Sequence, residues 1–442
     1  MIADLPLRLV PRLVRSLAFY WRSQHWSRDR LERHADDRLR RLVRHAGSNV
    51  PYYRELFRRI GLDPEGFRGR IDLARIPLLD KETLRQRSLE FLSDNLGRLD
   101  PAWERTSGST GTPLRVLRSA GSRVDNAAAT LRSYAWAGFF PGVKVFTLRW
   151  YRQGWLFRYS MAGRSLNAES TALDRALADT LWERINRLKP SVFHGQPFSL
   201  LILANYARNA GRAYHCPRSI ITFGESLPAS QRRRLSEAYR GARVFDYYGM
   251  TEGAALITAC PEGRLHALDD YAWHEFVDER GNPLEEGRGE IVGTGYSNDA
   301  MPLIRYRTRD FATLAPAGAR CPCGRALRVV EEIEGRADDF IVTPDGRALK
   351  DIEAPMDFGV GIAASQYVQD APDHLYVNVL PGPDYVPSSL VEVEKRLREH
   401  LGPAMRFEFR IVDQLERRAG GSAKTPFMIS RIGNTVDREA GA

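Results

Sequence analysis

The stretch Arg105–Val116, RTSGSTGTPLRV, decides how the rest of the chain is interpreted. Its glycines and small residues let backbone N–H groups converge on an anion. Hydroxyl donors are added by Thr106, Ser107, Ser109 and Thr110. A Walker A loop is excluded, because Gly108 and Gly111 are only three positions apart and no lysine follows. The stretch predicts a phosphate-binding loop whose positive charge comes from elsewhere, although alone it would also suit a flexible turn.

The surrounding chain has the composition of a large globular protein. Its 442 residues, 43% hydrophobic and 27% charged, exclude a disordered chain and predict two or three structural units. No apolar run approaches the roughly 18 residues of a membrane span, and without an export signal we expect a cytoplasmic protein. The net charge of +10 raises a nucleic-acid hypothesis, but the arginines are spread along the whole chain and lysines number only six.

The first hundred residues predict helices with short breaks. Residues 1–21 are basic and amphipathic and could lie on a membrane surface, but we favour a helix docked on its own protein. Residues 27–46 predict a helix behind Ser27 as N-cap. Its apolar face consists of Leu31, Ala35, Leu39, Leu42, Val43 and Ala46.

Strand-like and helical segments then alternate from about residue 101 to 335, which predicts a mostly parallel sheet with covering helices. Strands are expected at 143–148, 191–195, 219–224 and 242–249, helices at 171–189 and 228–241, and a hairpin at 274–296. The fold class is therefore α/β: a large N-terminal domain with mostly parallel sheets covered by helices plus a β-rich subdomain, and a small mobile α+β C-terminal domain. We expect a helical part over 1–100, a nucleotide- and acyl-binding core over 101–337, and a lid over 338–442.

Three further motifs carry groups that suit a nucleotide. DYYGMTEG, at 246–253, offers aromatic faces for a base, a hydroxyl for a phosphate and a carboxylate for Mg²⁺. MPLIRYRTRDF, at 301–311, places Asp310 after three arginines, where it could accept hydrogen bonds from ribose hydroxyls. EGRADDFIV, at 334–342, opens the small C-terminal unit.

In this order, TSGSTGTP, YYGMTEG, YRTRD and GRADD resemble the motifs of the adenylate-forming acyl/aryl ligase superfamily. VPYYRELF, IPLLDKETLR, MPLIRYRTRDF and CPCGR are similar to its phenylacetate–CoA ligase branch, including relatives in polysaccharide loci. The resemblance covers nearly the whole chain. It implies an ATP- and Mg²⁺-dependent ligase that joins a carboxylic acid to AMP, releases pyrophosphate, and passes the acyl group to a thiol of CoA or a carrier protein, or to an amine or hydroxyl.

The resemblance also implies roles for individual residues. Thr106–Gly111 would cradle the β- and γ-phosphates, Thr251 would contact the α-phosphate and Glu252 would bind Mg²⁺. Tyr248 would stack on adenine, with Gly224 and Glu225 at its edge, and Tyr247 and Gly249 belong to the same motif. Asp310 and Arg336 would hold the ribose. Lys424, in RRAGGSAKTP, would be the catalytic lysine, carried by a small domain that swings about Asp338.

Two departures from the family pattern bear on this interpretation. Thr112 stands where the family often has lysine, which weakens a direct contact of the loop to the γ-phosphate. VTPDGRALKDIEAP, at 342–355, lacks the Arg-Gly step common in CoA-using members, so CoA is one acceptor among several.

The cysteines form a second constellation. Cys260 and His266 precede the hairpin, and Cys321 and Cys323 follow it. Three thiolates and one imidazole would make a closed, structural zinc site; the alternative is four unrelated residues with reduced thiols. Cys216 is interpreted as a buried spectator.

The identity of the carboxylic acid substrate is what the sequence determines least. For the acyl pocket we nominate Trp150, Tyr151, His194, Gln196, Phe198 and Tyr247, which suit an aryl or arylacetic acid but would equally suit a core. A basic zinc-bearing nucleic-acid-binding protein and a non-catalytic relative remain as alternatives. The former leaves four ordered motifs unexplained, and the latter conflicts with the retained Thr251, Glu252, Asp310 and Lys424. We expect a monomer or homodimer.

Overall fold

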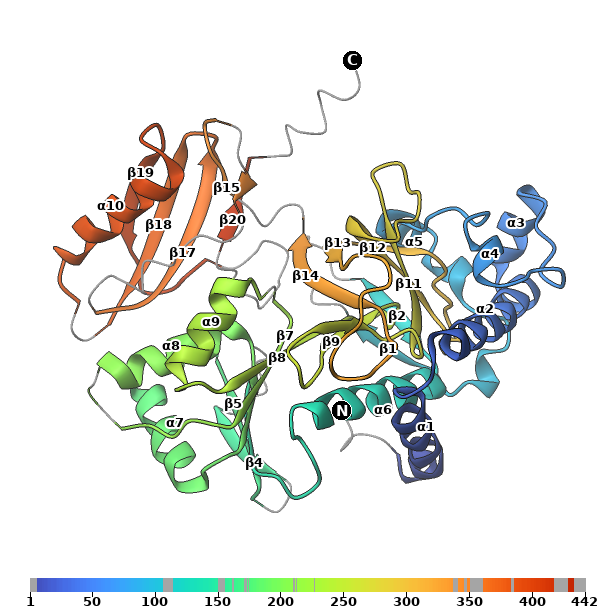
Figure 1. The fold of residues 1–442 in the computed structure, drawn as a ribbon, viewed down its shortest axis with the longest axis horizontal. Coiled ribbons are helices and arrows are strands. Elements are labelled where there is room, and N and C mark those ends of the chain that lie inside the picture. Colours follow the sequence, from blue (N-terminus) through green and yellow to red (C-terminus); the bar gives the residue numbers. More distant parts are fainter. Residues whose placement is uncertain are drawn as a thin grey trace. The chain divides into compact units, whose positions relative to one another are not determined.

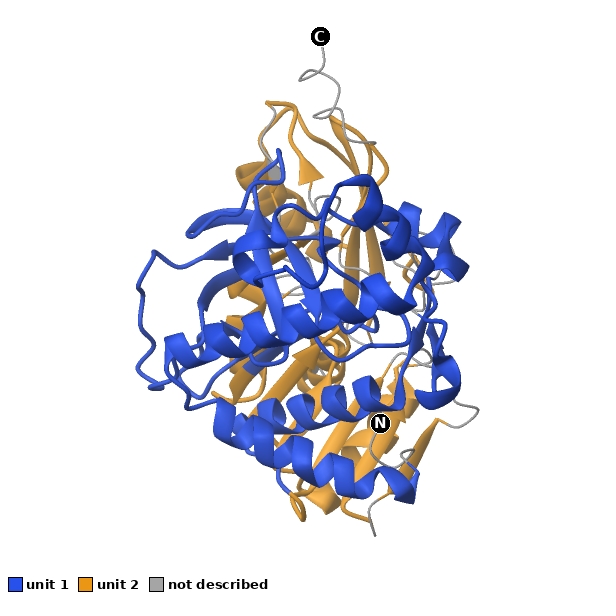
Figure 2. Ribbon diagram, turned by 90° about the vertical axis from the view of Figure 1, so that its right-hand side faces the viewer, with its two compact units in different colours: residues 1–106, 113–140, 245–333 blue, residues 107–112, 141–244, 334–442 orange. Residues whose placement is uncertain are grey.

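A computed structural model describes the fold over residues 6–105, 114–149, 156–160, 163–170, 173, 175–209, 211, 213–225, 227–336, 341–345, 348–349, 361–382, 385–416 and 428–432. The chain forms two compact units, each built from separate segments (Figure 2). Unit 1 comprises residues 1–106, 113–140 and 245–333, and unit 2 comprises 107–112, 141–244 and 334–442. The chain therefore passes between the units several times, including within strands β8 and β14.

Unit 1 begins with helices, as predicted. The helices are η1 (Leu7–Leu9), α1 (Val10–Ser23), α2 (Arg28–Asn49), α3 (Pro51–Arg59), α4 (Arg70–Leu73), α5 (Lys81–Gln86), η2 (Ser88–Phe91), η3 (Leu96–Arg98) and α6 (Ala120–Trp136). Ser27 is the N-cap of α2, and the six buried residues of α2 are the six predicted for its apolar face. The core beneath α2 also includes residues of α3 and of the segment before β13. The 3.6-residue periodicity therefore located both the helix and its packing face.

Strands of unit 1 are mainly antiparallel and form the β-rich part (Figure 1). Their order is β11 (Ala272–Val277), β12 (Gly287–Gly295), β13 (Tyr306–Leu314), β14 (Val329–Arg336), β10 (Leu265–Ala267), β9 (Leu256–Ala259) and β8 (Arg243–Gly249). β11 and β12 are the predicted hairpin. Separately, β1 (Ala102–Arg105) and β2 (Arg115–Arg118) pair antiparallel.

Unit 2 contains the predicted parallel sheet. Its strands lie in the order β7 (Ser219–Phe223), β6 (Val192–Gly195), β3 (Val145–Arg149), β5 (Ser165–Glu169) and β4 (Phe157–Ser160), and only β4 runs antiparallel to its neighbour. The helices of this region are α7 (Arg175–Leu188), α8 (Pro197–Asn209) and α9 (Ala229–Ala238). The buried, β-branched and aromatic runs of β3, β6 and β7 are typical of parallel strands covered on both faces.

The C-terminal part of unit 2 is the predicted α+β element. β17 (Ile362–Ala371) pairs antiparallel with β18 (His374–Pro381), while β19 (Arg406–Ile411) and β20 (Met428–Ser430) add parallel at the two edges. Helix α10 (Ser389–Leu401) and a short pair, β15 (Ile341–Val342) with β16 (Ala348–Leu349), complete it. The α/β fold class is confirmed, whereas the boundary at residue 337 and the mobility of the lid stay predictions.

A buried histidine joins several elements of unit 1. The Nδ1 atom of His274 lies 3.2 Å from Oδ1 of Asp269, and its Nε2 accepts from the backbone N–H of Leu256 at 3.0 Å. Asp269 also accepts from Arg28 and Arg328. Burial lowers the pKa of His274, and its hydrogen bonds require the neutral ring. The imidazole therefore acts as a fixed bridge between β11 and the start of β9.

Stability should depend on pH through this bridge. The pKa of His274 is lower in the folded than in the unfolded chain, so the native state binds fewer protons. The contribution of His274 is complete above about pH 6.5 and is lost as the pH falls below that value. We expect the free energy of unfolding in urea to fall between pH 7.5 and 5.0, and to fall less steeply in His274→Gln. His400→Gln, at an exposed position of α10, is the control. An identical pH dependence in wild type and His274→Gln would contradict this role.

Candidate functional site

Two hydrogen bonds bring the predicted nucleotide-contacting side chains of unit 1 together. The hydroxyl of Tyr248, at the end of β8, donates to Oδ2 of Asp310 on β13 at 2.8 Å. The hydroxyl of Tyr306, also on β13, donates to Oε1 of Glu252 at 3.1 Å. Residues more than fifty positions apart in the sequence are thus joined side by side. Tyr306 is part of this arrangement, although sequence reasoning gave it no role.

Asp310 lies in a β-bulge. Between Val292 and Glu290 of β12, the partners on β13 advance from Arg307 to Phe311, so β13 carries two extra residues. Within the bulge Arg309 has a φ of +63°, a conformation that is uncommon for residues other than glycine. Its backbone N–H donates to Oε1 of Glu290 at 3.1 Å. Bulges redirect a side chain out of the regular alternation of a strand, and here the redirected group is the Asp310 carboxylate.

The arginines before Asp310 hold this part of the sheet in place. Arg305 is buried, has a φ of +52°, and its Nη2 lies 2.9 Å from Oε1 of Glu275. It also donates to the carbonyl of Ile76 at 2.7 Å. Arg307 donates from Nε to Glu290 at 2.9 Å. Arg305 and Arg307 are thus paired with carboxylates of the same unit, and these ion pairs help to hold β13 in place.

A buried arginine supports the turn that carries Thr251 and Glu252. Nη1 of Arg118, on β2, donates to the carbonyl of Thr251 at 2.5 Å, and its Nε donates to Ser122 at 2.5 Å. The guanidinium lies against Gly253, where φ is +69° and an added Cβ would stand 2.8 Å from Cζ of Arg118. Only glycine fits this position without displacement, which explains the last residue of the YYGMTEG motif.

Tyr247, nominated for both the nucleotide and the acid, packs against α6. Its hydroxyl lies 2.8 Å from Oγ1 of Thr130, and its ring makes an edge contact with Tyr134. Burial raises its pKa, so the phenol stays protonated. The ring also explains Gly249, since a Cβ there would stand 2.7 Å from Cε1 of Tyr247. Within unit 1 this tyrosine therefore supports the motif from behind.

The base of the predicted phosphate loop is a strand pair with two arginines. Arg105 and Arg115 are directly paired across β1 and β2, and both are exposed. The Arg115 guanidinium lies 4.8 Å from the ring of Trp103, a cation–π contact. Paired residues of an antiparallel ladder project to the same face, so two positive charges stand together where the loop begins and ends.

Two residues nominated for the acid and two nominated for the edge of adenine lie at one edge of the unit 2 sheet. His194 and Gln196 lie at the carboxyl end of β6, and Gly224 and Glu225 follow the neighbouring β7. His194 is buried 4.4 Å from the Phe223 ring, and burial lowers its pKa well below the usual value, so the ring is neutral. The carboxyl ends of parallel strands are where ligands bind in open α/β sheets. Phe198, in contrast, is a buried member of the core.

The four predicted zinc ligands come together in unit 1. Their ligand atoms all lie within 4.8 Å of one another. Sγ of Cys260 is 3.6 Å from Sγ of Cys321, and Sγ of Cys323 is 3.4 Å from Nε2 of His266. Nδ1 of His266 faces the carbonyl of Leu327 at 3.1 Å, which fixes the tautomer that leaves Nε2 for a ligand bond. Burial lowers the pKa of His266 to about 4, so this nitrogen is unprotonated at neutral pH.

Comparison with known proteins assigns the family. Residues 106–298 match the model of the AMP-binding enzymes. The chain is 31% identical to a phenylacetate–coenzyme A ligase of Thermus thermophilus over 71% of its own length and 72% of the relative. The chain belongs to the phenylacetate–coenzyme A ligase family. A second member, from Pseudomonas putida, is 29% identical over 71% of this chain and 72% of its own. As a member of this family, the protein is an AMP-forming ligase.

The fold agrees with that of a solved ligase. A crystal structure of a 2-hydroxyisobutyryl-CoA ligase in its post-adenylation state superposes with a TM-score of 0.71, at 20% identity, over 94% of this chain and 92% of that one. At this identity the likeness concerns the fold.

Several predicted residues of this phenylacetate–coenzyme A ligase family member lie outside the described residues. They are Thr106–Gly111, Thr112, Trp150, Tyr151, Asp338 and Lys424, and for Arg336 only the backbone, in β14, is described. Tyr306 and Arg118 contact candidate site residues, and sequence reasoning gave neither of them a role. Tyr306 stands inside the motif that placed Asp310, but nothing in its spacing indicated a bond to Glu252.

Proposed function

We propose that this enzyme activates an aryl or arylacetic acid with ATP and passes the acyl group to the thiol of CoA. The observation that carries the proposal is a pair of hydrogen bonds in a chain of this family, from Tyr248 to Asp310 and from Tyr306 of the same strand, β13, to Glu252. One carboxylate oxygen of the acid attacks the α-phosphorus, and the bond to the pyrophosphate oxygen breaks. The products are the acyl-adenylate and pyrophosphate. The thiolate sulfur then attacks the acyl carbon and AMP leaves.

Each of these side chains has a role that suits its position. Asp310, redirected by the bulge, accepts hydrogen bonds from the ribose hydroxyls. The ring of Tyr248 offers a face to adenine. Glu252 supplies carboxylate oxygens, the ligands Mg²⁺ prefers, and Tyr306 fixes their orientation. When bound there, the ion neutralises charge on the phosphates. Arg118 holds the Thr251 carbonyl and thereby the direction of the turn.

The positive charge that the phosphate loop lacks comes from two places in this proposal. Arg105 and Arg115 stand paired at the base of the loop and lower the cost of bringing a polyanion there. Lys424 contacts the α-phosphate while charge develops on it. The segment after Asp338 moves as a lid and carries Lys424 into and out of this position.

An aryl or arylacetic acid is supported by the edge of the unit 2 sheet and by the relatives. Buried His194 and Gln196 provide polar atoms beside aromatic rings, a combination typical of small-molecule pockets. The curated relatives carry the name phenylacetate–coenzyme A ligase. The missing Arg-Gly step after the hinge makes a carrier-protein thiol or an amine the alternative acceptor.

The proposal is tested by acid-dependent ATP–pyrophosphate exchange over a panel of aryl, arylacetic, fatty and amino acids without CoA. We expect exchange with arylacetic or aryl acids, and its loss in Glu252→Ala; Glu262→Ala, in the turn between β9 and β10, is the matched control. Adding CoA should then yield a thioester detectable by mass spectrometry. Exchange with fatty or amino acids only would contradict the acid class. Release of AMP when an amine is added, but not when CoA is added, would contradict CoA as the acceptor.

We further propose that the cluster of Cys260, His266, Cys321 and Cys323 holds a structural zinc ion. Tetrahedral geometry with the usual bond lengths places two sulfurs about 3.8 Å apart and a sulfur and a nitrogen about 3.5 Å apart. The distances of 3.6 and 3.4 Å are close to these values. Four protein ligands close the site. They tie the turn after β9 to the turn that follows β13, and β13 is the strand that carries Asp310.

Purified protein should therefore contain about one zinc ion per chain by elemental analysis. Cys321→Ser should lose most of the metal and melt at a lower temperature, because metal binding contributes directly to folding. Cys216→Ser, which lies outside the cluster, is the control and should keep the ion. Equal zinc content in Cys321→Ser and wild type would exclude the site.

A further inference from the structure

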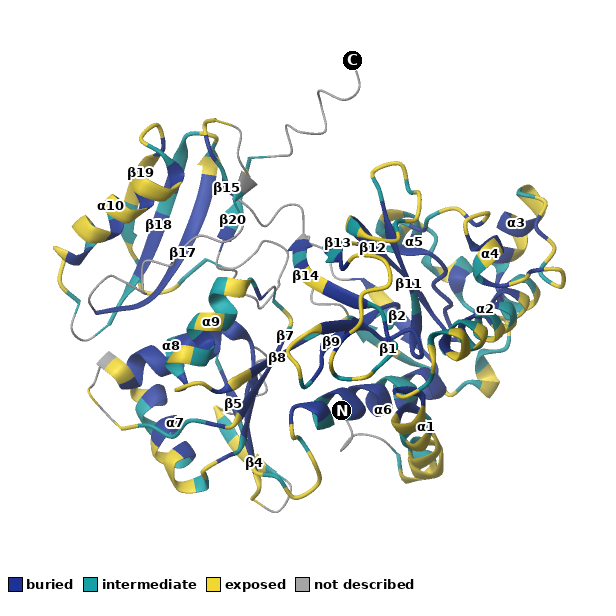
Figure 3. Ribbon diagram, in the orientation of Figure 1, coloured by how far each residue is buried: buried dark blue, intermediate teal, exposed yellow. Residues whose placement is uncertain are grey.

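Helix α1 has two apolar faces, and only one of them is covered. Its inner face packs along α6: Ser16 donates to Asp125 at 2.7 Å, and Leu13, Leu17 and Tyr20 join a core cluster. The preference for a docked helix is therefore confirmed. Figure 3 shows, however, that the outer side of α1 is largely exposed. Docking on α6 therefore accounts for the inner apolar face of α1 but not for the outer one.

The uncovered face is an apolar stripe. Val10, Val14 and Trp21 are 44%, 58% and 53% exposed, and Leu7 of the preceding η1 is 88% exposed. Spacings of three, four and seven residues place these side chains on one side of the helix, with exposed Ala18 among them. Isolated exposed apolar residues are ordinary, but four on one helical stripe mark an interaction surface.

The charged residues of the N-terminal segment itself are all positive. Arg8, Arg15 and Arg22 follow it at seven-residue intervals and are exposed. The sequence from Pro6 to Arg28 contains no acidic residue. An apolar stripe with tryptophan, flanked by arginines, is the composition of helices that lie in the surface of a bilayer with anionic lipids. At fourteen residues α1 is too short to cross the membrane, and none of the helices in the described part of the chain could span one.

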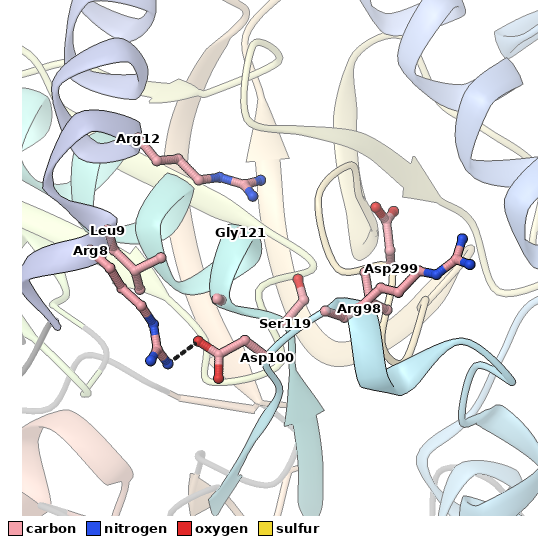
Figure 4. A pocket seen from close by; sticks show the side chains of 10 residues that line it. Arg8, Leu9, Arg12, Arg98, Asp100, Ser119, Gly121 and Asp299 are labelled. Atoms are coloured by element: carbon pink, nitrogen blue, oxygen red, sulfur yellow. Dashed lines mark hydrogen bonds and ion pairs between the residues drawn. The ribbon is translucent and has the colours of Figure 1, made fainter.

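Beside the start of α1, a hollow of about 300 Å³ is lined by further arginines (Figure 4). Arg8 reaches Asp100 at 2.7 Å, and the other acid of the lining, Asp299, is paired with Arg41. Among the described residues, Arg12 and Arg98 have no carboxylate partner. Arg12 lies directly against Gly121, where a side chain would collide with its guanidinium. The hollow therefore offers uncompensated positive charge beside the start of α1.

We propose that the outer face of α1 binds the surface of an anionic phospholipid bilayer. Leu7, Val10, Val14 and Trp21 enter the boundary between headgroups and acyl chains. The flanking arginines then face the phosphates. The enzyme is thereby held as a peripheral membrane protein, independently of whether its activity is the one proposed above.

The test is sedimentation of the full chain with vesicles of phosphatidylcholine alone and of phosphatidylcholine with 30% phosphatidylglycerol. We expect binding to the anionic vesicles, a weak or absent response to the neutral ones, and a blue shift of Trp21 emission that Trp21→Phe removes. The triple variant Arg8→Gln/Arg15→Gln/Arg22→Gln should bind about 100-fold more weakly, since each arginine near such a surface contributes roughly fivefold. Val14→Ser/Trp21→Ser should also lose binding.

The matched control is Ile71→Ser/Val391→Ser, which removes two apolar side chains that are 74% and 72% exposed on α4 and α10. It should bind as wild type does, and circular dichroism and melting should show all variants folded. Three results would overturn the proposal: no binding to anionic vesicles, binding that both α1 variants retain, or a dimer that dissociates when Val14 and Trp21 are replaced. A shift of Trp21 emission with inorganic phosphate but not with vesicles would also overturn the proposal, because the hollow would then bind a free anion and not a bilayer.

Discussion

Lys424→Ala should lower the rate of acyl-adenylate formation by about 100- to 1,000-fold, with the KM for the acid changed little. Negative charge builds on the α-phosphate only as the acid oxygen attacks, and a cation placed there acts on the transition state more than on bound ATP. The loop itself offers no lysine, and the arginines at its base, Arg105 and Arg115, lie outside the loop. The measurement is single-turnover formation of the acyl-adenylate at saturating ATP.

Two comparisons make this result specific. Lys395→Ala, on the exposed side of α10, removes a lysine from the same C-terminal part and should leave the rate unchanged. Presynthesised acyl-adenylate should be converted to the thioester by Lys424→Ala at a rate close to that of wild type. A rate of adenylate formation within threefold of wild type would show that Lys424 does not contact the α-phosphate.

Asp270→Asn should destabilise the protein by about 3–5 kcal/mol. Arg132 of α6 and Asp270 are both fully buried and joined by hydrogen bonds of 2.7 and 3.2 Å. Asp270 also accepts from Ser23, and Arg132 donates to the Tyr20 carbonyl at 3.2 Å, so the pair fastens α1. Removing the carboxylate charge leaves the Arg132 guanidinium buried without the group that neutralises it.

The measurement is denaturant unfolding, followed by circular dichroism and by tryptophan emission. Asp100→Asn is the matched control, because it breaks the exposed ion pair with Arg8, which should contribute less than about 1 kcal/mol. If the two variants were equally stable, the buried pair would not hold α1. Asp270→Asn should also weaken vesicle binding, because α1 would be held less firmly and would no longer present its apolar stripe as a fixed surface.

Much of the fold follows from local periodicity. The face of α2 was recovered residue by residue, and β3, β6, β7 and the hairpin of β11 and β12 lie where alternation and turn residues placed them. These patterns are readable because burial requires the same residue types wherever they occur. The cysteine cluster was predictable for a different reason, since thiols and an imidazole in one chain have few common uses besides a metal site.

The sequence was least informative where a conformation depends on distant partners. Asp310 was identified, but its bulge needs Arg309 in a left-handed conformation and Glu290 on another strand, and neither is visible in local spacing. The same holds for Arg305, one of the three arginines before Asp310, whose ion pair with Glu275 on another strand is not visible in the sequence. Tyr247 and Tyr248 are adjacent and chemically identical, and only their partners distinguish them, since Tyr247 contacts α6 and Tyr248 donates to Asp310.

The division of the chain into two interleaved units separates two kinds of evolutionary change. Tyr248, Glu252 and Asp310, proposed for the nucleotide, belong to unit 1, whereas His194 and Gln196, proposed for the acid, belong to unit 2. Substitutions at the end of β6 can therefore retarget the enzyme to another carboxylic acid without disturbing the bulge or the YYGMTEG turn. A lineage with this architecture can diversify its substrates while inheriting its use of ATP unchanged.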